Sequence, residues 1–155
     1  MGVAREIYQD HLDAVSEAIW DRRFDDVAAL MAYPHRRRLG TRDIVVDDPD
    51  MLRAEARAFR ETLDGFGATG YIRVCRHAVS DAPGRIVGLH ETFVVRGGTY
   101  QVSPYEAEIT LLRHGDRWFA SDCHAPTFPL SVNNYPLARE ADLRRGTTSD
   151  RKASQ

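Results

Sequence analysis

Hydrophobic residues recur at helical spacing near the start of the chain. Tyr8, Leu12, Val15 and Ile19 fall on one face of a helix, which predicts an amphipathic helix from Val3 to about Trp20. Charged and polar residues occupy the opposite face. We therefore expect this helix to lie on the surface of a domain with its apolar stripe against the core.

Two further helices are expected before the middle of the chain. A short helix should begin near Asp25, whose carboxylate can accept hydrogen bonds from the first free backbone N–H groups. A longer helix should follow Asp48, which can act as its N-cap, while Pro49 suits the first helical position because no N–H is needed there. This helix should end near Gly65. Its apolar stripe comprises Leu52, Ala56, Phe59 and Leu63.

Alternating hydrophobic and polar positions mark the following segments as strands. Residues 35–46 should form a short hairpin. The longer strands are expected at Tyr71–Ser80, Arg85–Arg96, Thr99–Arg113 and Arg117–Ala125, with a bend at Pro104. Helices that precede a series of strands describe an α+β domain, in which N-terminal helices pack on a curved, mostly antiparallel sheet and leave a pocket at one end.

Length and charge narrow the class of protein. The 155 residues suffice for one domain, which we place at residues 1–126, followed by a polar C-terminal tail at 127–155 that is partly helical or disordered. The net charge of −2 argues against a nucleic-acid or anionic-membrane binder. No run reaches the ~18 apolar residues of a membrane span. The start of the chain lacks an apolar signal region, so we expect a cytoplasmic protein.

One basic cluster departs from this even charge balance. Residues 35–38 read His-Arg-Arg-Arg, and Arg42 follows closely. Such a cluster can be a solvated edge strand, because charges protect sheet edges from mispairing, or it can bind a phosphate or an acidic ligand. The sequence leaves both interpretations open. Cys75 and Cys123 have no spacing typical of a zinc site, and we expect neither a metal nor a cofactor.

Three segments resemble a known superfamily. They are the opening helix at Tyr8–Val15, the short helix at Asp25–Leu30 and the closing strand at Gly115–Phe119. In this order they resemble the NTF2-like superfamily, and within it the SnoaL-like and ketosteroid-isomerase-like proteins with the cystatin-type α+β cone. The resemblance implies helices that roof a curved sheet, and a homodimer formed through the exposed face of that sheet. Superfamilies of this kind carry many activities, so the fold alone does not name one.

The resemblance also directs attention to residues that could transfer protons. An isomerase of this type needs a carboxylate base where this chain has residues 31–35, which offer Tyr33 and no carboxylate. Dehydratases and cyclases use His with Asp or Tyr. Asp122 and His124 are two residues apart on the last strand, so we expect them on one face together with Trp118. His90 is the third candidate, although a buried histidine that only satisfies its own hydrogen bonds is an equally simple interpretation.

Aromatic residues are the candidates for ligand binding. Tyr105 has inward parity on its strand and carries a hydroxyl that needs a partner, and Trp118 should wall the pocket. Tyr8 and Tyr33 complete this set. The leading hypothesis is that the pocket binds a small hydrophobic or weakly acidic ligand. The alternatives are a lyase or isomerase that uses His124 or His90 for proton transfer, with Asp122 orienting His124 and Tyr105 as the electrophile, and a dimeric interaction module without catalysis.

Overall fold

The computed structural model describes residues 2–125, and the tail expected at 127–155 lies outside them. Three helices come first in this part of the chain: α1 at Gly2–Trp20, α2 at Phe24–Ala29 and α3 at Pro49–Gly65. The strands are β1 at Met31–Leu39, β2 at Arg42–Val46, β3 at Gly70–Ala82, β4 at Arg85–Arg96, β5 at Thr99–Tyr100, β6 at Tyr105–His114 and β7 at Arg117–Ala125.

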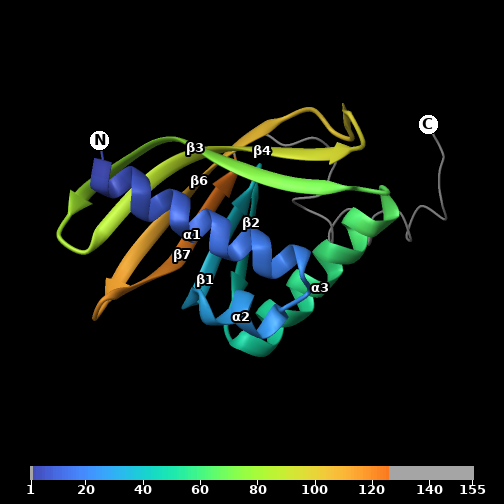
Figure 1. Ribbon diagram of the computed structural model, residues 1–155. Helices are drawn as coiled ribbons and strands as arrows, with labels where there is room; N and C mark the ends of the chain where they lie inside the picture. Colours follow the sequence, from blue (N-terminus) through green and yellow to red (C-terminus); the bar gives the residue numbers. More distant parts are fainter. Residues whose placement is uncertain (1, 126–155) are drawn as a thin grey trace.

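The strands form one mixed sheet in the order β2-β1-β7-β6-β4-β3, with β5 paired to β4. All neighbouring pairs are antiparallel except β1 and β7, which run parallel. Figure 1 shows this sheet strongly curved, with α1 lying across it and α3 beside one end. The predicted α+β architecture, with N-terminal helices on a curved and mostly antiparallel sheet, is confirmed.

The helix ends follow the sequence rules with one exception. Asp48 caps α3, because its Oδ1 accepts a hydrogen bond from the backbone N–H of Met51 at 2.9 Å. The expected cap at Asp25 is wrong. Arg23 occupies that position without a side-chain cap. Asp25 lies in the first turn of α2, where its negative charge interacts favourably with the positive end of the helix dipole.

Strand boundaries depart from the expected ones at two prolines. The expected strand 99–113 is divided, since β5 ends at Tyr100 and β6 begins at Tyr105, on either side of Pro104. The hairpin expected at residues 35–46 begins earlier, at Met31. Pro34 therefore lies within β1, after a cis peptide bond with Tyr33. Pro lacks the N–H that a helix needs, but a strand accepts it where no ladder hydrogen bond is required.

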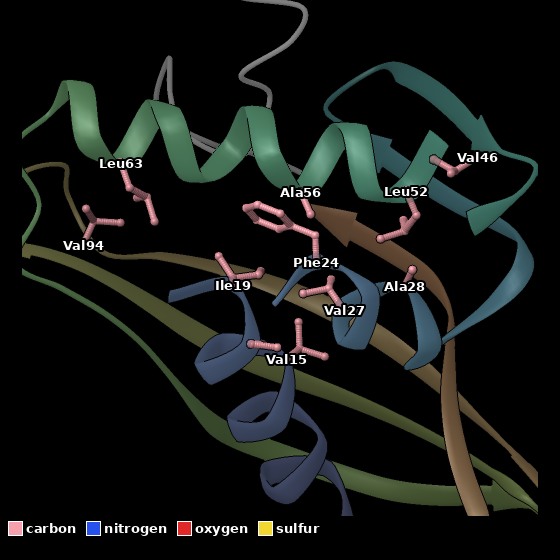
Figure 2. Packing of buried hydrophobic residues seen from close by; sticks show 11 residues of the cluster. Val15, Ile19, Phe24, Val27, Ala28, Val46, Leu52, Ala56, Leu63 and Val94 are labelled. Carbon is pink, nitrogen blue, oxygen red and sulfur yellow. The ribbon is translucent and has the colours of Figure 1, made fainter. Parts of the chain in front are cut away.

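The main hydrophobic core lies between the three helices and the concave face of the sheet. Figure 2 shows Val15 and Ile19 of α1, Val27 of α2, and Leu52 and Ala56 of α3 turned toward one another. All five side chains are less than a tenth exposed. Burial of this apolar surface is the main stabilising contribution, at roughly 25 cal/mol per Å².

A second hydrophobic cluster lies beneath the N-terminal half of α1. Tyr8 packs there on Gly88 of β4, where a methyl group would come within 2.4 Å of the tyrosine ring. Trp118 packs at the edge of this cluster. None of the helices in the described part of the chain combines the length and apolar character that crossing a bilayer requires.

Candidate functional site

A pocket of about 120 Å³ opens on the concave side of the sheet, between the helices and strands β1, β3, β6 and β7. Much of its wall is apolar and comes from Val15, Ile19, Val27, Met31, Leu52, Ala56, Phe59, Ile109 and Ala120. Its polar lining comes from His11, His35, Arg37, Glu55, Tyr71, Arg73 and Cys123. A dry apolar cavity of ~150 Å³ can hold benzene, so a pocket of this size admits a molecule of about one small ring.

His35 of β1 is buried in the pocket wall, with 5% of its surface exposed. Its Nδ1–H donates a hydrogen bond to the carbonyl oxygen of Ala120 at 2.9 Å, because that oxygen can only accept. Burial lowers the pKa of His35 to about 4, so the ring is neutral at pH 7. Nε2 then carries a lone pair, and no group in residues 2–125 donates a hydrogen bond to it.

His11 of α1, which also lines the pocket, has the same arrangement. Its Nε2–H donates to the carbonyl oxygen of Leu30 at 2.9 Å, and burial lowers its pKa to about 4. The backbone N–H of Ala120 donates to the same Leu30 oxygen at 3.0 Å. The two rings are therefore held by hydrogen bonds to two neighbouring backbone segments, the end of α2 and the middle of β7. In each ring the nitrogen that is not bonded to the backbone is a hydrogen-bond acceptor.

The outer part of the pocket is more polar. Arg37 of β1 forms an ion pair with Glu55 of α3, and both side chains are about one-fifth exposed, at 19% and 22%. Tyr71 and Cys123 lie nearby, and burial raises the pKa of both groups. Both are therefore protonated at pH 7. The hydroxyl of Tyr71 makes no hydrogen bond within residues 2–125.

Arg73 lies between α1 and the sheet and carries a positive charge at the pocket wall. Its Nε–H donates to the hydroxyl of Ser16 at 2.9 Å, and Nη2 donates to the carbonyl oxygen of Leu12 at 3.2 Å. Its guanidinium carbon is 5.6 Å from the centre of the Tyr71 ring. These partners are all neutral, and Arg73 forms no ion pair with a carboxylate of the described chain.

The residues expected from the sequence do not gather at this pocket. Tyr8 and His90 lie deeper under α1, where the Tyr8 hydroxyl donates to His90 Nδ1 at 2.8 Å. Burial raises the pKa of Tyr8 and lowers that of His90 well below 6.5, so both are neutral. Tyr33 donates to the carbonyl oxygen of Ala28 at 2.7 Å, outside the pocket lining. These three residues thus have partners within the fold.

Tyr105 and Trp118 both lie on the concave face, as expected, but neither lines the pocket. Tyr105 is 6% exposed, and its hydroxyl has no hydrogen-bond partner within residues 2–125. Burial raises its pKa well above 10, and Thr92, which lies directly opposite on β4, does not form a hydrogen bond with it. Trp118 packs under α1 instead of walling the pocket.

The expectation that Asp122 and His124 share a face with Trp118 is wrong. Thr110 pairs with Asp122, whereas the next residue of β6, Leu111, pairs with Ala120, so Ser121 is an extra residue in β7. This β-bulge reverses the alternation that follows it. Asp122 and His124 consequently lie on the convex face, beside Arg36 and Arg38, and line a separate hollow with Asp43.

The sequence contains partial evidence for the pocket residues that were not among the expected site residues, namely His11, His35 and Arg37. His11 falls on the same helical face as Tyr8 and Val15, so its burial follows from the spacing used for the core. His35 and Arg37 are two apart on a strand, which turns both to the concave face and separates them from Arg36 and Arg38. The basic cluster is thus two sets of side chains with different surroundings. Arg38 forms an exposed ion pair with Asp43, as expected for a solvated strand.

A metal site is not formed in the described region, because no three His, Cys, Asp or Glu residues among residues 2–125 gather closely enough to hold an ion. The polar groups of the pocket are instead hydrogen-bond donors and acceptors. They suit an organic molecule with one or two polar groups on a small apolar body.

Comparison with solved structures gives many matches with low sequence identity. An NTF2-like protein of unknown function from Shewanella oneidensis aligns with a TM-score of 0.61 and 10% identity, over 77% of this chain and 96% of that chain. An NTF2-like protein with a cystatin-like fold from Novosphingobium aromaticivorans aligns with a TM-score of 0.58 and 12% identity, over 87% of this chain and 88% of that chain. A protein of unknown function from Mycobacterium tuberculosis aligns with a TM-score of 0.63 and 12% identity, over 95% of this chain and 92% of that chain.

Sequence comparisons add no further relative. No family model matches the chain, and no curated protein matches it. Identities near one in ten establish a shared fold and carry no activity with them.

Proposed function

Because the chain has the NTF2-like, cystatin-type fold, we propose that it binds a small, mainly apolar molecule in the pocket on its concave face. The single observation that carries the proposal is the pair of buried, neutral histidines. His11 and His35 each use one ring nitrogen for a backbone carbonyl, and the other nitrogen has no donor in residues 2–125. A ligand with a hydroxyl or a similar donor would satisfy these acceptors.

Burial gives each histidine a defined hydrogen-bonding role. An apolar surrounding lowers the pKa of both imidazoles to about 4, so the ring nitrogen that is not hydrogen-bonded to the backbone is an acceptor at pH 7. A hydrogen bond typically contributes ~0.5–1.5 kcal/mol net. A ligand hydroxyl that donates to His35 Nε2 would add such a contribution, so binding should favour molecules with a donor over hydrocarbons of the same size.

The test compares phenol with toluene, which have similar size and differ in the hydroxyl. Phenol should bind about tenfold more tightly, as one hydrogen bond of ~1.4 kcal/mol predicts. His35→Asn retains a donor at the position of Nδ1 for the Ala120 carbonyl and removes the acceptor Nε2. It should abolish the preference for phenol. Isothermal titration calorimetry measures both affinities.

The matched control is His77→Asn, which changes an exposed histidine on β3. It should leave both affinities unchanged. A pocket-filling variant, Ala56→Leu, should prevent both ligands from binding, since Ala56 is 7% exposed and lines the pocket. Equal affinities of the unmutated protein for phenol and toluene would contradict the proposal. The same holds if His77→Asn loses the preference for phenol as completely as His35→Asn does.

A further inference from the structure

Arg73 of β3 is a pocket-lining cation with no carboxylate partner among residues 2–125. Two of its guanidinium nitrogens donate to the neutral oxygens of Ser16 and Leu12. A guanidinium has five N–H donors, so these contacts hold the side chain in place and leave other donors available. A half-buried positive charge without a negative partner favours whatever anion can reach it.

The other charged groups around Arg73 do not neutralise it. Glu55 of the pocket is paired with Arg37. Asp13 and Glu17 of α1 line a groove on the outer side of Arg73, but neither forms an ion pair with it, and Asp13 accepts a hydrogen bond from Gln9 at 2.8 Å. The charge of Arg73 lowers the pKa of groups on several sides, including Tyr71, His11 and Cys123. Arg73 is thus a half-buried positive charge without an ion-pair partner among residues 2–125.

Two tyrosine hydroxyls near this charge also lack partners. Tyr71 is two residues before Arg73 on the same face of β3, lines the pocket, and makes no hydrogen bond in the described chain. Tyr105 lies in the same cross-strand row as Arg73, since both pair with Thr92, and its buried hydroxyl is unsatisfied. Arg73 and the Tyr71 hydroxyl in the pocket lining, with the Tyr105 hydroxyl in the row behind them, form a donor set that suits the two oxygens of a carboxylate.

We infer that the ligand is a small carboxylic acid that binds as its anion, with Arg73 as the anion-binding residue, Tyr71 as a second donor and Tyr105 behind them. The inference rests on the proposed function and names the class of ligand for the same pocket. The carboxylate would face β3, and the apolar body would lie among Val15, Val27 and Ala56. A hydroxyl on that body would meet His35, so small hydroxy acids with one ring suit the pocket best.

The experiment uses benzoate and benzamide, which share size and shape and differ in charge. The unmutated protein should bind benzoate at least tenfold more tightly than benzamide in calorimetry at pH 7 and low salt. Arg73→Gln should remove this preference while benzamide still binds. Tyr71→Phe removes the hydroxyl and keeps the ring. It should weaken the binding of benzoate several-fold and leave the affinity for benzamide unchanged.

Arg76→Gln is the matched control, because it removes the same charge from an exposed position of the same strand, where Arg76 pairs with Glu91 at 2.7 Å. It should leave the benzoate preference intact. The inference is overturned if the unmutated protein binds benzamide as tightly as benzoate. It is also overturned if Arg76→Gln and Arg73→Gln lose the preference for benzoate equally. If Arg73→Gln does not fold, the inference is tested by the preference of the unmutated protein for benzoate over benzamide and by the change in that preference in Tyr71→Phe.

The two proposals fail in different ways. Binding of phenol that depends on His35, without a preference for benzoate over benzamide, refutes the carboxylate inference and retains the proposed function. Absence of binding by all four probes refutes both.

Discussion

At the residue scale, the distinctive feature of the protein is the number of histidines that the fold keeps neutral. His11, His35 and His90 are 7%, 5% and 2% exposed, and each makes a hydrogen bond through one ring nitrogen. Burial lowers the pKa of each, because an apolar surrounding disfavours the imidazolium form. Since the unfolded chain binds these protons near pH 6.5, folding is linked to pH.

The protein should therefore lose stability in mild acid. The folded state resists protonation down to about pH 4 at His11 and His35, so stability is full above pH 6.5 and falls as the pH decreases toward 4. At pH 5 the loss amounts to about 2 kcal/mol per histidine, from ~1.4 kcal/mol per pKa unit. His11→Gln, which can still donate to Leu30, should show a smaller loss between pH 7 and pH 5 in urea unfolding.

His77→Gln serves as the comparison for this measurement, because His77 is exposed. Its unfolding free energy should follow the same pH dependence as the unmutated protein. If His11→Gln were to lose as much stability as the unmutated chain, then His11 would not be the neutral, buried group described above.

At the element scale, single residues in the strands decide how the sheet and helices meet. Ser121 adds a bulge to β7, which turns Asp122 and His124 to the convex face and leaves the Ala120 carbonyl to accept from His35. Gly88 in β4 acts differently. It leaves room for the ring of Tyr8, so that α1 approaches the sheet closely and the Tyr8 hydroxyl reaches His90.

Gly88→Ala should consequently be strongly destabilising. The new methyl group would lie 2.4–2.7 Å from three atoms of the Tyr8 ring, and neither the ring nor the strand can move without breaking buried contacts. Overpacking of this kind costs about 1–3 kcal/mol. Gly98→Ala in the turn after β4 meets no atom within 4 Å and should change the unfolding free energy by less than ~0.5 kcal/mol. Equal effects of the two substitutions on thermal unfolding would contradict this account of Gly88.

At the scale of the whole molecule, the two faces of the sheet differ. The concave face holds the core and the pocket. The convex face of β3 and β4 carries exposed or half-exposed apolar side chains, including Ile72 at 51% and Val79 at 42% exposure. Glu91 on this face forms an ion pair with Arg76. Exposed apolar surface of this kind is typical of protein–protein interaction sites, and we propose that it pairs with a second copy of the chain.

The proposed homodimer can be tested with a charge on this face. Ile72→Glu should convert a dimer into a monomer, because the carboxylate would be buried without a partner in the interface. Val3→Glu, on a 72% exposed residue of α1 away from the sheet, should remain dimeric. Analytical ultracentrifugation at micromolar concentration measures both. A monomeric unmutated chain, or dissociation in both variants, would refute pairing through this face.

The sequence alone determined the local elements. The helical spacing of Tyr8, Leu12 and Val15, the cap at Asp48 and the alternation in β4 predicted α1, α3 and that strand correctly, since these signals depend only on neighbouring residues. Their order predicted the α+β fold and the NTF2-like resemblance. Tyr105 was also placed correctly on the concave face. The expected ligand and its role remain predictions.

Only the tertiary structure decided which side chains share the pocket. His11, His35 and Arg73 lie on α1, β1 and β3, and they meet because β1 pairs in parallel with the last strand while α1 crosses the sheet. No local pattern encodes such a pairing. A period of two also cannot locate the bulge at Ser121, where one inserted residue moves every later side chain to the opposite face.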